Sequence, residues 1–403
     1  MYTHKPRLWT RDFILLTLTN LFLATGSFLL IPVLPIYVRD MFGASKTEIG
    51  YIMGFYTLSA LLLRPFAGFA LDALGRKSIY LLGLALFVLL MPSYAWVSSM
   101  WMLLGIRFLQ GMSWGIVTTG GSTIASDIVP LERRGEGIGY FGMSFTIAMA
   151  LGPVLGLTLI QGIDYPSLFY LTTTVALITF VLANLIKYPQ IVQSGKSSFV
   201  WTKDIFYDAR VIPASMLALI SSGVYGGLIS FIGLFMEESG IRTGYALMDS
   251  GAAFFMAYAL GLTIIRPIAG VQMDRHGPAQ VMGAGFIALI IGLLTLASAQ
   301  EIWSFLLASL ISGIGMGVIM PTVITMVVNM VEPQRRGVAN STFFSAVDIG
   351  VGVGTVLLGR LADLTSVRMM YYYCAGLMIV PLILFFFYVL KDYQQKLASA
   401  RSE

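Results

Sequence analysis

The stretch RPFAGFALDALGRK, from Arg64 to Lys77, gathers four charged residues in a chain that is otherwise strongly apolar. A related stretch, RPIAGVQMDRHGPA, begins at Arg266, 202 residues further along. A charged pattern that returns at a fixed distance indicates an internal repeat, so the same local structure is expected twice in this chain.

The composition predicts a membrane protein. Hydrophobic residues make up 57% of the 403 residues, and Asp, Glu, Lys and Arg only 11%, against about 25% in an ordinary soluble protein. The net charge of +5 does not indicate nucleic acid binding, because the position of each charge matters more than the sum. One cysteine (Cys374) and two histidines (His4 and His276) leave almost no material for a disulfide, a metal site or histidine catalysis. We therefore expect no metal, no cofactor and no enzyme activity.

Apolar windows of about 20 residues, the length of a transmembrane helix, predict twelve spans. Those in the first half lie near 13–37, 47–70, 78–96, 101–127, 137–160 and 166–187. Those in the second half lie near 211–236, 247–271, 279–299, 302–330, 338–361 and 369–390. Most of the 25 Lys and Arg residues fall in loops on the side of the N-terminus, so both termini are expected in the cytoplasm.

The two halves of the chain match at the spacing of 202 residues without a gap. The matched pairs are Arg64/Arg266, Pro65/Pro267, Gly68/Gly270, Asp72/Asp274, Gly75/Gly277, Gly111/Gly313, Gly115/Gly317, Arg133/Arg335, Arg134/Arg336, Gly135/Gly337 and Gly152/Gly354. Six spans per half is an even number, so the two repeats run parallel. We expect an N-terminal six-helix bundle over 1–187, a cytoplasmic linker over 188–210 and a C-terminal six-helix bundle over 211–403.

The charged residues of the first stretch have a local physical explanation. Arg64, Gly68 and Asp72 follow at i, i+4 and i+8, so they share one helix face. A glycine on that face lets a neighbouring backbone come close. The face therefore predicts a tight helix contact with a carboxylate at one end.

Asp72 lies near the expected C-terminus of its helix, where a negative charge is unfavourable unless a cation answers it. Arg76 and Lys77 supply cations about one turn later, and Gly75 can end the helix. The stretch therefore predicts a tight turn with a charge clamp at the cytoplasmic surface. The alternative is that these charges only enforce topology.

The segment GFALDALGRK, from Gly68 to Lys77, resembles the signature between the second and third helices of the major facilitator superfamily. The resemblance implies an all-α integral membrane protein with twelve transmembrane helices in two pseudo-symmetric six-helix bundles. It also implies a cytoplasmic latch in which the aspartate and arginine meet an acid at the inner end of the fourth helix, here Asp127. The second copy keeps Asp274 but has Pro278 in place of Arg76, so its latch is expected to be weaker or differently wired. The predicted gate comprises Gly68, Asp72, Gly75, Arg76, Lys77, Asp127 and Asp274.

Three further segments resemble motifs of the twelve-helix drug:proton antiporters. RFLQGMSWG, from Arg107 to Gly115, resembles the fourth-helix arginine motif. AMALGPVLG, from Ala148 to Gly156, resembles the fifth-helix antiporter motif, although Ala148 stands where a glycine is usual. IPVLP, from Ile31 to Pro35, resembles the first-helix motif. The antiporter motif residues are Gly152, Pro153 and Gly156, and the resemblance favours export over import.

Asp348 and Arg107 are the candidates for proton coupling. A charge near the bilayer centre costs about 2.5–3.5 kcal/mol, so it needs a partner, a water-filled cavity or a function. By resemblance, the eleventh helix packs against the second, so Asp348 could carry a proton by alternating between a pair with Arg64 and a protonated state, or it could form a static ion pair. By resemblance, Arg107 influences proton release from a nearby acid; the alternative is a structural hydrogen-bond anchor.

The substrate cavity is expected at the midplane between the bundles. Its candidate residues are Asn20, Arg64, Gln110, Thr146 and Arg266. The repeat mate of Asp348 is Thr146, so Arg266 lacks the acid expected near Arg64 and could receive an anionic group of the substrate. Snorkelling of Arg266 toward the cytoplasm is the alternative. The first helix carries Asn20 but no acid, which favours a neutral, zwitterionic or acidic substrate over a lipophilic cation.

The predicted function is proton-coupled efflux of a small amphipathic organic compound by alternating access, in a multi-pass protein of the cell membrane that works as a monomer. Its partners are the lipid bilayer, protons and the substrate. No G-x-x-x-x-G-K-[ST] phosphate loop occurs, which disfavours an ATP-driven pump. The alternatives are a facilitator or importer of a sugar or organic acid, an exporter of an acidic metal-chelating metabolite, and a membrane receptor that transports nothing.

Overall fold

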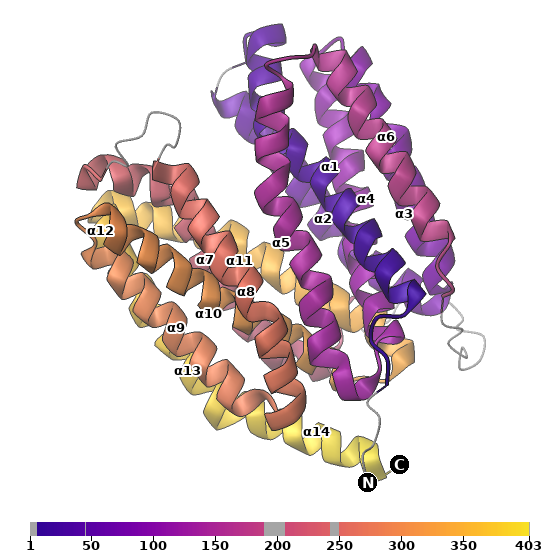
Figure 1. Cartoon of the computed structure of the whole chain (residues 1–403), viewed down its shortest axis with the longest axis vertical. Helices are drawn as coiled ribbons and strands as arrows, with labels where there is room; N and C mark the ends of the chain where they lie inside the picture. Colours follow the sequence, from indigo (N-terminus) through magenta and orange to yellow (C-terminus); the bar gives the residue numbers. More distant parts are fainter. Residues whose placement is uncertain (1–5, 45, 189–205, 242–249, 403) are drawn as a thin grey trace. The chain divides into compact units, whose positions relative to one another are not determined.

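Helices make up almost all of the structure, a computed structural model that describes residues 6–44, 46–188, 206–241 and 250–402 (Figure 1). The helices of the first half are α1 (Arg11–Phe42), α2 (Lys46–Ala73), α3 (Arg76–Leu90), α4 (Met100–Ile128), α5 (Arg134–Leu159) and α6 (Tyr165–Asn184). Those of the second half are α7 (Ile212–Ser239), α8 (Ser250–His276), α9 (Pro278–Ser298), α10 (Ile302–Asn329) and α11 (Arg336–Leu364), followed by a last rod of α12 (Val367–Leu377), α13 (Ile379–Leu384) and α14 (Leu390–Ser402).

Eleven helical stretches in the described part of the chain are long and apolar enough to cross a membrane. The helix that fails this criterion is α4, although it is 29 residues long. Its sequence is rich in Gly, Ser and Thr, and α2 and α3 pack against it, so much of it is buried by protein. A helix enclosed by its neighbours needs less apolar surface than one that faces lipid.

The chain divides into two compact units, and each takes a short segment from the other half of the sequence. Unit 1 comprises Met1–Leu131, Phe141–Asp208 and Glu332–Thr342. Unit 2 comprises Glu132–Tyr140, Ala209–Val331 and Phe343–Glu403. The start of α11 therefore belongs to unit 1 and the start of α5 to unit 2. The bundle boundaries expected at 187 and 211 stay a prediction, and most of the expected linker, 189–205, lies outside the described residues.

Within unit 1, α1 packs against α6, and α4 packs against both α2 and α3. Within unit 2, α10 packs between α8 and α9, and these three helices lie side by side in Figure 1. The packing repeats at the spacing seen in the sequence. A Cβ atom added at Gly111 would lie 2.1 Å from the carbonyl oxygen of Tyr56, and one at Gly313 would lie 2.2 Å from that of Tyr258. The sequence repeat is therefore also a repeat of helix contacts.

The turns after α2 and α8 also repeat. Gly75 has φ of +98° and Gly277 has φ of +74°, a region that side chains with a Cβ rarely adopt. The second helix of each half thus ends two residues or fewer before a glycine, and the third begins directly after it. This geometry places the charged residues of the two turns at equivalent positions.

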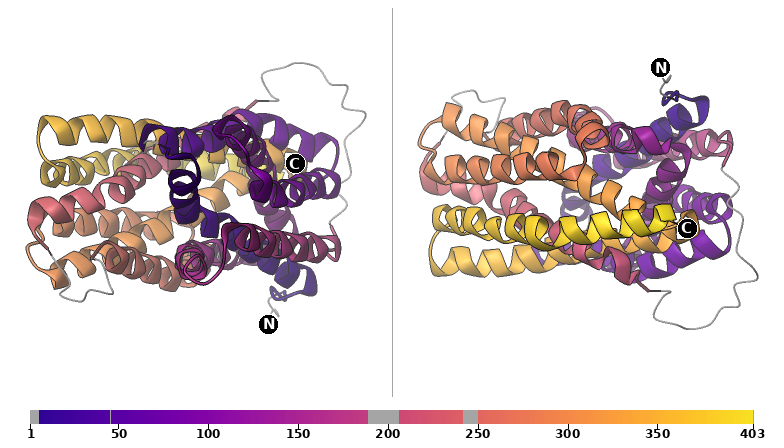
Figure 2. Two further views of the ribbon diagram at one scale, coloured as in Figure 1. Left: turned by 90° about the horizontal axis from the view of Figure 1, so that it is seen from above. Right: turned by 90° about the horizontal axis from the view of Figure 1, so that it is seen from below.

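The C-terminal rod runs from α12 to α14 with one π turn, Phe385–Val389, between α13 and α14, and appears in yellow in Figure 2. Polar contacts hold its last part to the rest of unit 2. The side chain of Asn329 donates to the hydroxyl of Tyr393 (3.2 Å), and Lys396 donates to the backbone carbonyl of Arg210 (2.7 Å). The final helix is thereby fixed beside the ends of α10 and α7.

The glycine contacts lead to a stability prediction. We expect Gly313→Ala to lower the midpoint of thermal unfolding of the purified protein, because the new methyl group must push back the α8 backbone, at a cost of about 1–3 kcal/mol. Gly105→Ala is the matched control, since no atom lies within 4 Å of the position that its methyl group would take, and alanine favours helix. Equal midpoints for the two variants would contradict the account.

Candidate functional site

Asp72, at the end of α2, accepts two hydrogen bonds from the start of α11. The backbone N–H of Gly337 donates to its Oδ1 and that of Val338 to its Oδ2, both at 2.8 Å. The first N–H groups of a helix have no partner within the helix, and the helix dipole makes this end positive. A carboxylate satisfies both needs. Gly68 permits the approach, since a Cβ there would lie 2.6 Å from the carbonyl oxygen of Gly337.

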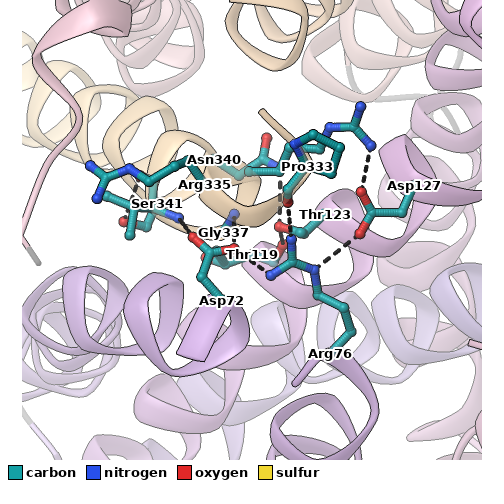
Figure 3. A network of polar contacts seen from close by, with 12 residues as sticks. Asp72, Arg76, Thr119, Thr123, Asp127, Pro333, Arg335, Gly337, Asn340 and Ser341 are labelled. Atoms are coloured by element: carbon teal, nitrogen blue, oxygen red, sulfur yellow. Dashed lines mark hydrogen bonds and ion pairs between the residues drawn. The ribbon is translucent and has the colours of Figure 1, made fainter. Parts of the chain in front are cut away.

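Two arginines and a second carboxylate complete this group, which we call the Asp72 cluster: Asp72, Arg76, Asp127, Arg336 and the first turn of α11. Figure 3 shows Asp72, Arg76 and Asp127 of this cluster. Arg76 pairs with Asp72 and, through Nε, with Asp127 at 3.0 Å. Arg336 donates to the other oxygen of Asp127 at 2.6 Å. The side chains of Arg76 and Asp127 are 4% and 2% exposed, so the pairing takes place largely out of water.

The cluster is balanced in charge and tied to backbone. Its two carboxylates face two guanidinium groups, which offsets the cost of burial. Arg76 also donates to the carbonyl of Pro333 at 2.5 Å, directly before α11 (Figure 3). Removal of one partner would leave a buried charge unanswered, which typically costs about 3–5 kcal/mol.

Further contacts within unit 1 hold the start of α11. Asn340 donates to the hydroxyl of Thr123 at 3.0 Å, and Arg335 pairs with the buried Asp208 at 3.1 Å. The N–H of Asp208 in turn donates to the hydroxyl of Thr342 at 3.1 Å. The first two turns of α11 are therefore anchored at several points besides Asp72.

Asp274, the repeat mate of Asp72, makes the equivalent contact in unit 2. The N–H groups of Gly135 and Glu136, at the start of α5, donate to its two oxygens at 2.8 and 2.9 Å. A Cβ at Gly270 would lie 2.5 Å from the carbonyl oxygen of Gly135, as at Gly68 in the first copy. We call Asp274, Arg134, Asn329 and the first turn of α5 the Asp274 cluster.

The Asp274 cluster differs from the first in its charges. Pro278 stands where the first copy has Arg76, and Asn329 stands where it has Asp127. Arg134, the repeat mate of Arg336, donates to Oδ1 of Asn329 at 2.6 Å, so an amide takes the place of a carboxylate. The second copy is thus arranged differently: Asp274 accepts from a helix N-terminus, Arg134 donates to an amide, and Arg133 pairs with Glu136 beside them.

Arg107 lies buried in α4 beside Gln110 and Tyr56. Its guanidinium donates to the side-chain carbonyl of Gln110 at 2.9 Å and lies 4.9 Å from the ring centre of Tyr56. The hydroxyl of Tyr94 donates to the same carbonyl. These contacts favour the structural interpretation of Arg107. They also give Gln110 two protein hydrogen-bond partners, and its place in the substrate cavity stays a prediction.

Four other residues predicted for the cavity or for proton coupling lie on α1, α2, α5 and α11. Asn20 is buried and donates to the hydroxyl of Ser144 at 2.8 Å, which joins α1 to α5. Thr146 is buried and donates to the carbonyl of Gly142 in its own helix at 3.3 Å. Arg64 is buried and donates to Thr118 at 2.9 Å. Asp348 is half-buried on α11, and its predicted pairing with Arg64 stays a prediction.

The fifth-helix motif forms a close contact with α1 in unit 1. A Cβ at Gly152 would lie 2.6 Å from the Cβ of Phe28, and one at Gly156 would lie 2.4 Å from the carbonyl oxygen of Leu29. Pro153 lies between them within α5. The small residues of the motif therefore allow two helix backbones to approach each other.

The gate predicted from the sequence includes Lys77, which lies outside the Asp72 cluster. It lacks Arg336 of the Asp72 cluster and Arg134 of the Asp274 cluster. Lys77 is exposed on α3, and the cation at Asp72 is Arg76. The sequence pattern marks Arg336 and Arg134 only as members of the repeat. Their matched positions, together with the pair Asp127/Asn329 at the same spacing, were the signal that could have identified them.

Comparison with known proteins identifies the family. The family model described as the Major Facilitator Superfamily matches residues 16–264 and 251–403. The chain belongs to this superfamily. It is a membrane-embedded transporter of small molecules, and the predicted twelve-helix fold of the superfamily is confirmed.

The relatives of this transporter include a protein named for drug resistance. It is 27% identical over 355 residues to the quinolone resistance protein NorA of Staphylococcus aureus (strain COL), with 85% of this chain and 88% of that protein covered. It is 28% identical over 365 residues to the MFS-type transporter YhhS of Escherichia coli (strain K12), with coverage of 87% and 86%. The predicted resemblance to the drug:proton antiporters is confirmed.

Solved structures of the superfamily share the fold. The human organic anion transporter MFSD10 superposes with a TM-score of 0.81 at 16% identity, covering 94% of this chain and 100% of that one. The transporter FucP in the outward conformation gives a TM-score of 0.78 at 17% identity, with coverage of 94% and 98%. At these identities the likeness concerns the fold alone.

The difference between the clusters leads to a second prediction. Asp127→Ala should lower the free energy of unfolding by about 3–5 kcal/mol, because two buried arginines each lose a carboxylate partner. Asn329→Ala, at the repeat position, should cost only about 1–3 kcal/mol, since it removes an uncharged amide that bonds Arg134 and Tyr393. Thermal unfolding of both purified variants measures the difference. A larger loss for Asn329→Ala than for Asp127→Ala would contradict the charge assignment.

Proposed function

We propose that this transporter exports small amphipathic organic compounds from the cell by proton-coupled alternating access. The observation that carries the proposal is the 27% identity, over 85% of the chain, to a protein named for quinolone resistance. Resistance to a drug is the expected result of its export. The close packing of Gly152 and Gly156 against α1, in the motif typical of antiporters, supports the same direction of transport.

In this proposal the Asp72 and Asp274 clusters are the gate. Alternating access requires contacts that hold in one state and break in another. Both clusters join the end of one helix to the start of a helix from the other half of the sequence. The predicted orientation, from the distribution of Lys and Arg, places both at the cytoplasmic end with both termini. Their release would then open the cavity to the cytoplasm.

Proton coupling is assigned to Asp348, the half-buried carboxylate within α11. Its protonation would remove a negative charge from the membrane interior. It would therefore lower the free energy of the conformation in which Asp348 has left its cationic partner. One proton moved through 100 mV supplies about 2.3 kcal/mol, roughly a fifty-fold concentration gradient. Arg107, beside Gln110 and Tyr56, is assigned to the support of α4 rather than to proton transfer.

A transport experiment tests the proposal. Cells that lack their own drug exporters and make this protein should accumulate several-fold less norfloxacin, a quinolone, than cells without it. A protonophore should abolish the difference. Asp348→Asn should accumulate as much as cells without the protein, whereas Asp363→Asn, an exposed acid on the same helix, should behave as wild type.

Three outcomes would contradict the proposal in different ways. Reduced accumulation that a protonophore does not change would indicate a facilitator. Efflux by Asp348→Asn at the wild-type rate would remove Asp348 from the coupling mechanism. No flux of quinolones or of neutral and acidic solutes in proteoliposomes would indicate a receptor or a carrier of another substrate class.

A further inference from the structure

Unit 2 contains a buried hydroxyl that the fold does not satisfy. Tyr258 on α8 is 1% exposed, and its hydroxyl has no hydrogen-bond partner within the described ranges. Its ring stacks on that of Tyr225 from α7, with centroids 6.0 Å apart and planes at 30°. Buried polar groups are nearly always paired, and an exception indicates a place where water, an ion or a ligand completes the pairing.

A cation lies close to these two phenols. Arg266 follows Tyr258 by two turns of α8. Both phenol groups interact electrostatically with Arg266. Arg266 and Tyr225 are partly exposed, whereas Tyr258 is buried.

Comparison with the first copy shows that this arrangement is specific to unit 2. Arg64, the repeat mate of Arg266, donates to the hydroxyls of Thr118 and Thr119. The residues at the equivalent positions of α10 are Met320 and Pro321, which have no hydroxyl.

The tyrosines differ in the same way. Tyr56, the repeat mate of Tyr258, lies beside Arg107, whereas the repeat mate of Arg107 is Ser309. Leu23 stands where unit 2 has Tyr225. The repeat has thus kept the arginine and one tyrosine but changed what surrounds them.

We propose that Arg266, Tyr258 and Tyr225 form a binding site for the carboxylate of an aromatic organic acid. A guanidinium binds a carboxylate through two parallel hydrogen bonds, and the free hydroxyl of Tyr258 donates a third. The partly exposed ring of Tyr225 offers a stacking surface for the aromatic part. The inference rests on the proposed transport function, since it names the substrate class that this half of the protein recognises.

Binding of two probes of the same shape tests the site. Isothermal titration of the full chain in detergent compares 2-naphthoate with its neutral analogue 2-naphthamide. Arg266→Gln should weaken naphthoate binding about tenfold or more, and Tyr258→Phe about three- to tenfold, with little effect on naphthamide. Arg266→Lys should retain part of the affinity. Arg275→Gln, which removes an exposed arginine from the last turn of α8, is the matched control and should bind naphthoate as wild type does.

The outcomes separate the site from the transport function. Unchanged naphthoate binding in Arg266→Gln, an equal loss for both probes, or no naphthoate binding by the wild type would overturn the site. If Arg266→Gln fails to fold, Tyr258→Phe decides, because it removes a single oxygen atom. Arg266-dependent binding without proton-driven flux of any solute would support the site and contradict the proposed function.

Discussion

The structure depends on a carboxylate from one half of the sequence that satisfies the first N–H groups of a helix from the other half. A helix start placed against protein must find acceptors for these groups, and its partial positive charge favours an anion. Asp72 meets this need for α11, and Asp274 meets it for α5. Glycines on both partners permit the contact, since a Cβ at Gly68 or Gly270 would meet backbone within 2.6 Å. The contact therefore requires both the carboxylate of the aspartate and the glycines that let the two helices approach.

The two copies meet the same requirement with different strength. Around Asp72, two arginines and a second acid are largely buried, so a break in the cluster leaves strong charges unanswered. Around Asp274, a proline and Asn329 replace the corresponding arginine and acid, and the hydrogen bond from Arg134 goes to an amide. Neutral acceptors bind an arginine less strongly than carboxylates do. The hydrogen bond from Asn329 to Tyr393 also connects the Asp274 cluster to the last helix.

The helices and the repeated turn could be predicted from the sequence because the repeat has no gaps. Hydropathy and the spacing of 202 residues predicted the helices, the turn at Gly75 and the altered second copy. The partners of Asp72 could not be found in this way, because backbone N–H groups leave no trace in residue identity. The true cation was ambiguous between Arg76 and Lys77, since sequence spacing does not determine which side chain turns inward. The surroundings of Arg107 include Tyr56 from a different helix, which no local pattern indicates.

Amide hydrogen exchange tests the central contact most directly. Peptides that cover 336–342 and 134–140 report on the starts of α11 and α5, whose first N–H groups the two aspartates accept. Asp72→Ala should accelerate exchange at 336–342 and leave 134–140 as in the wild type, and Asp274→Ala should do the reverse. Exchange that stays unchanged in both variants, or that rises equally in both segments, would contradict the assignment of each carboxylate to its own helix.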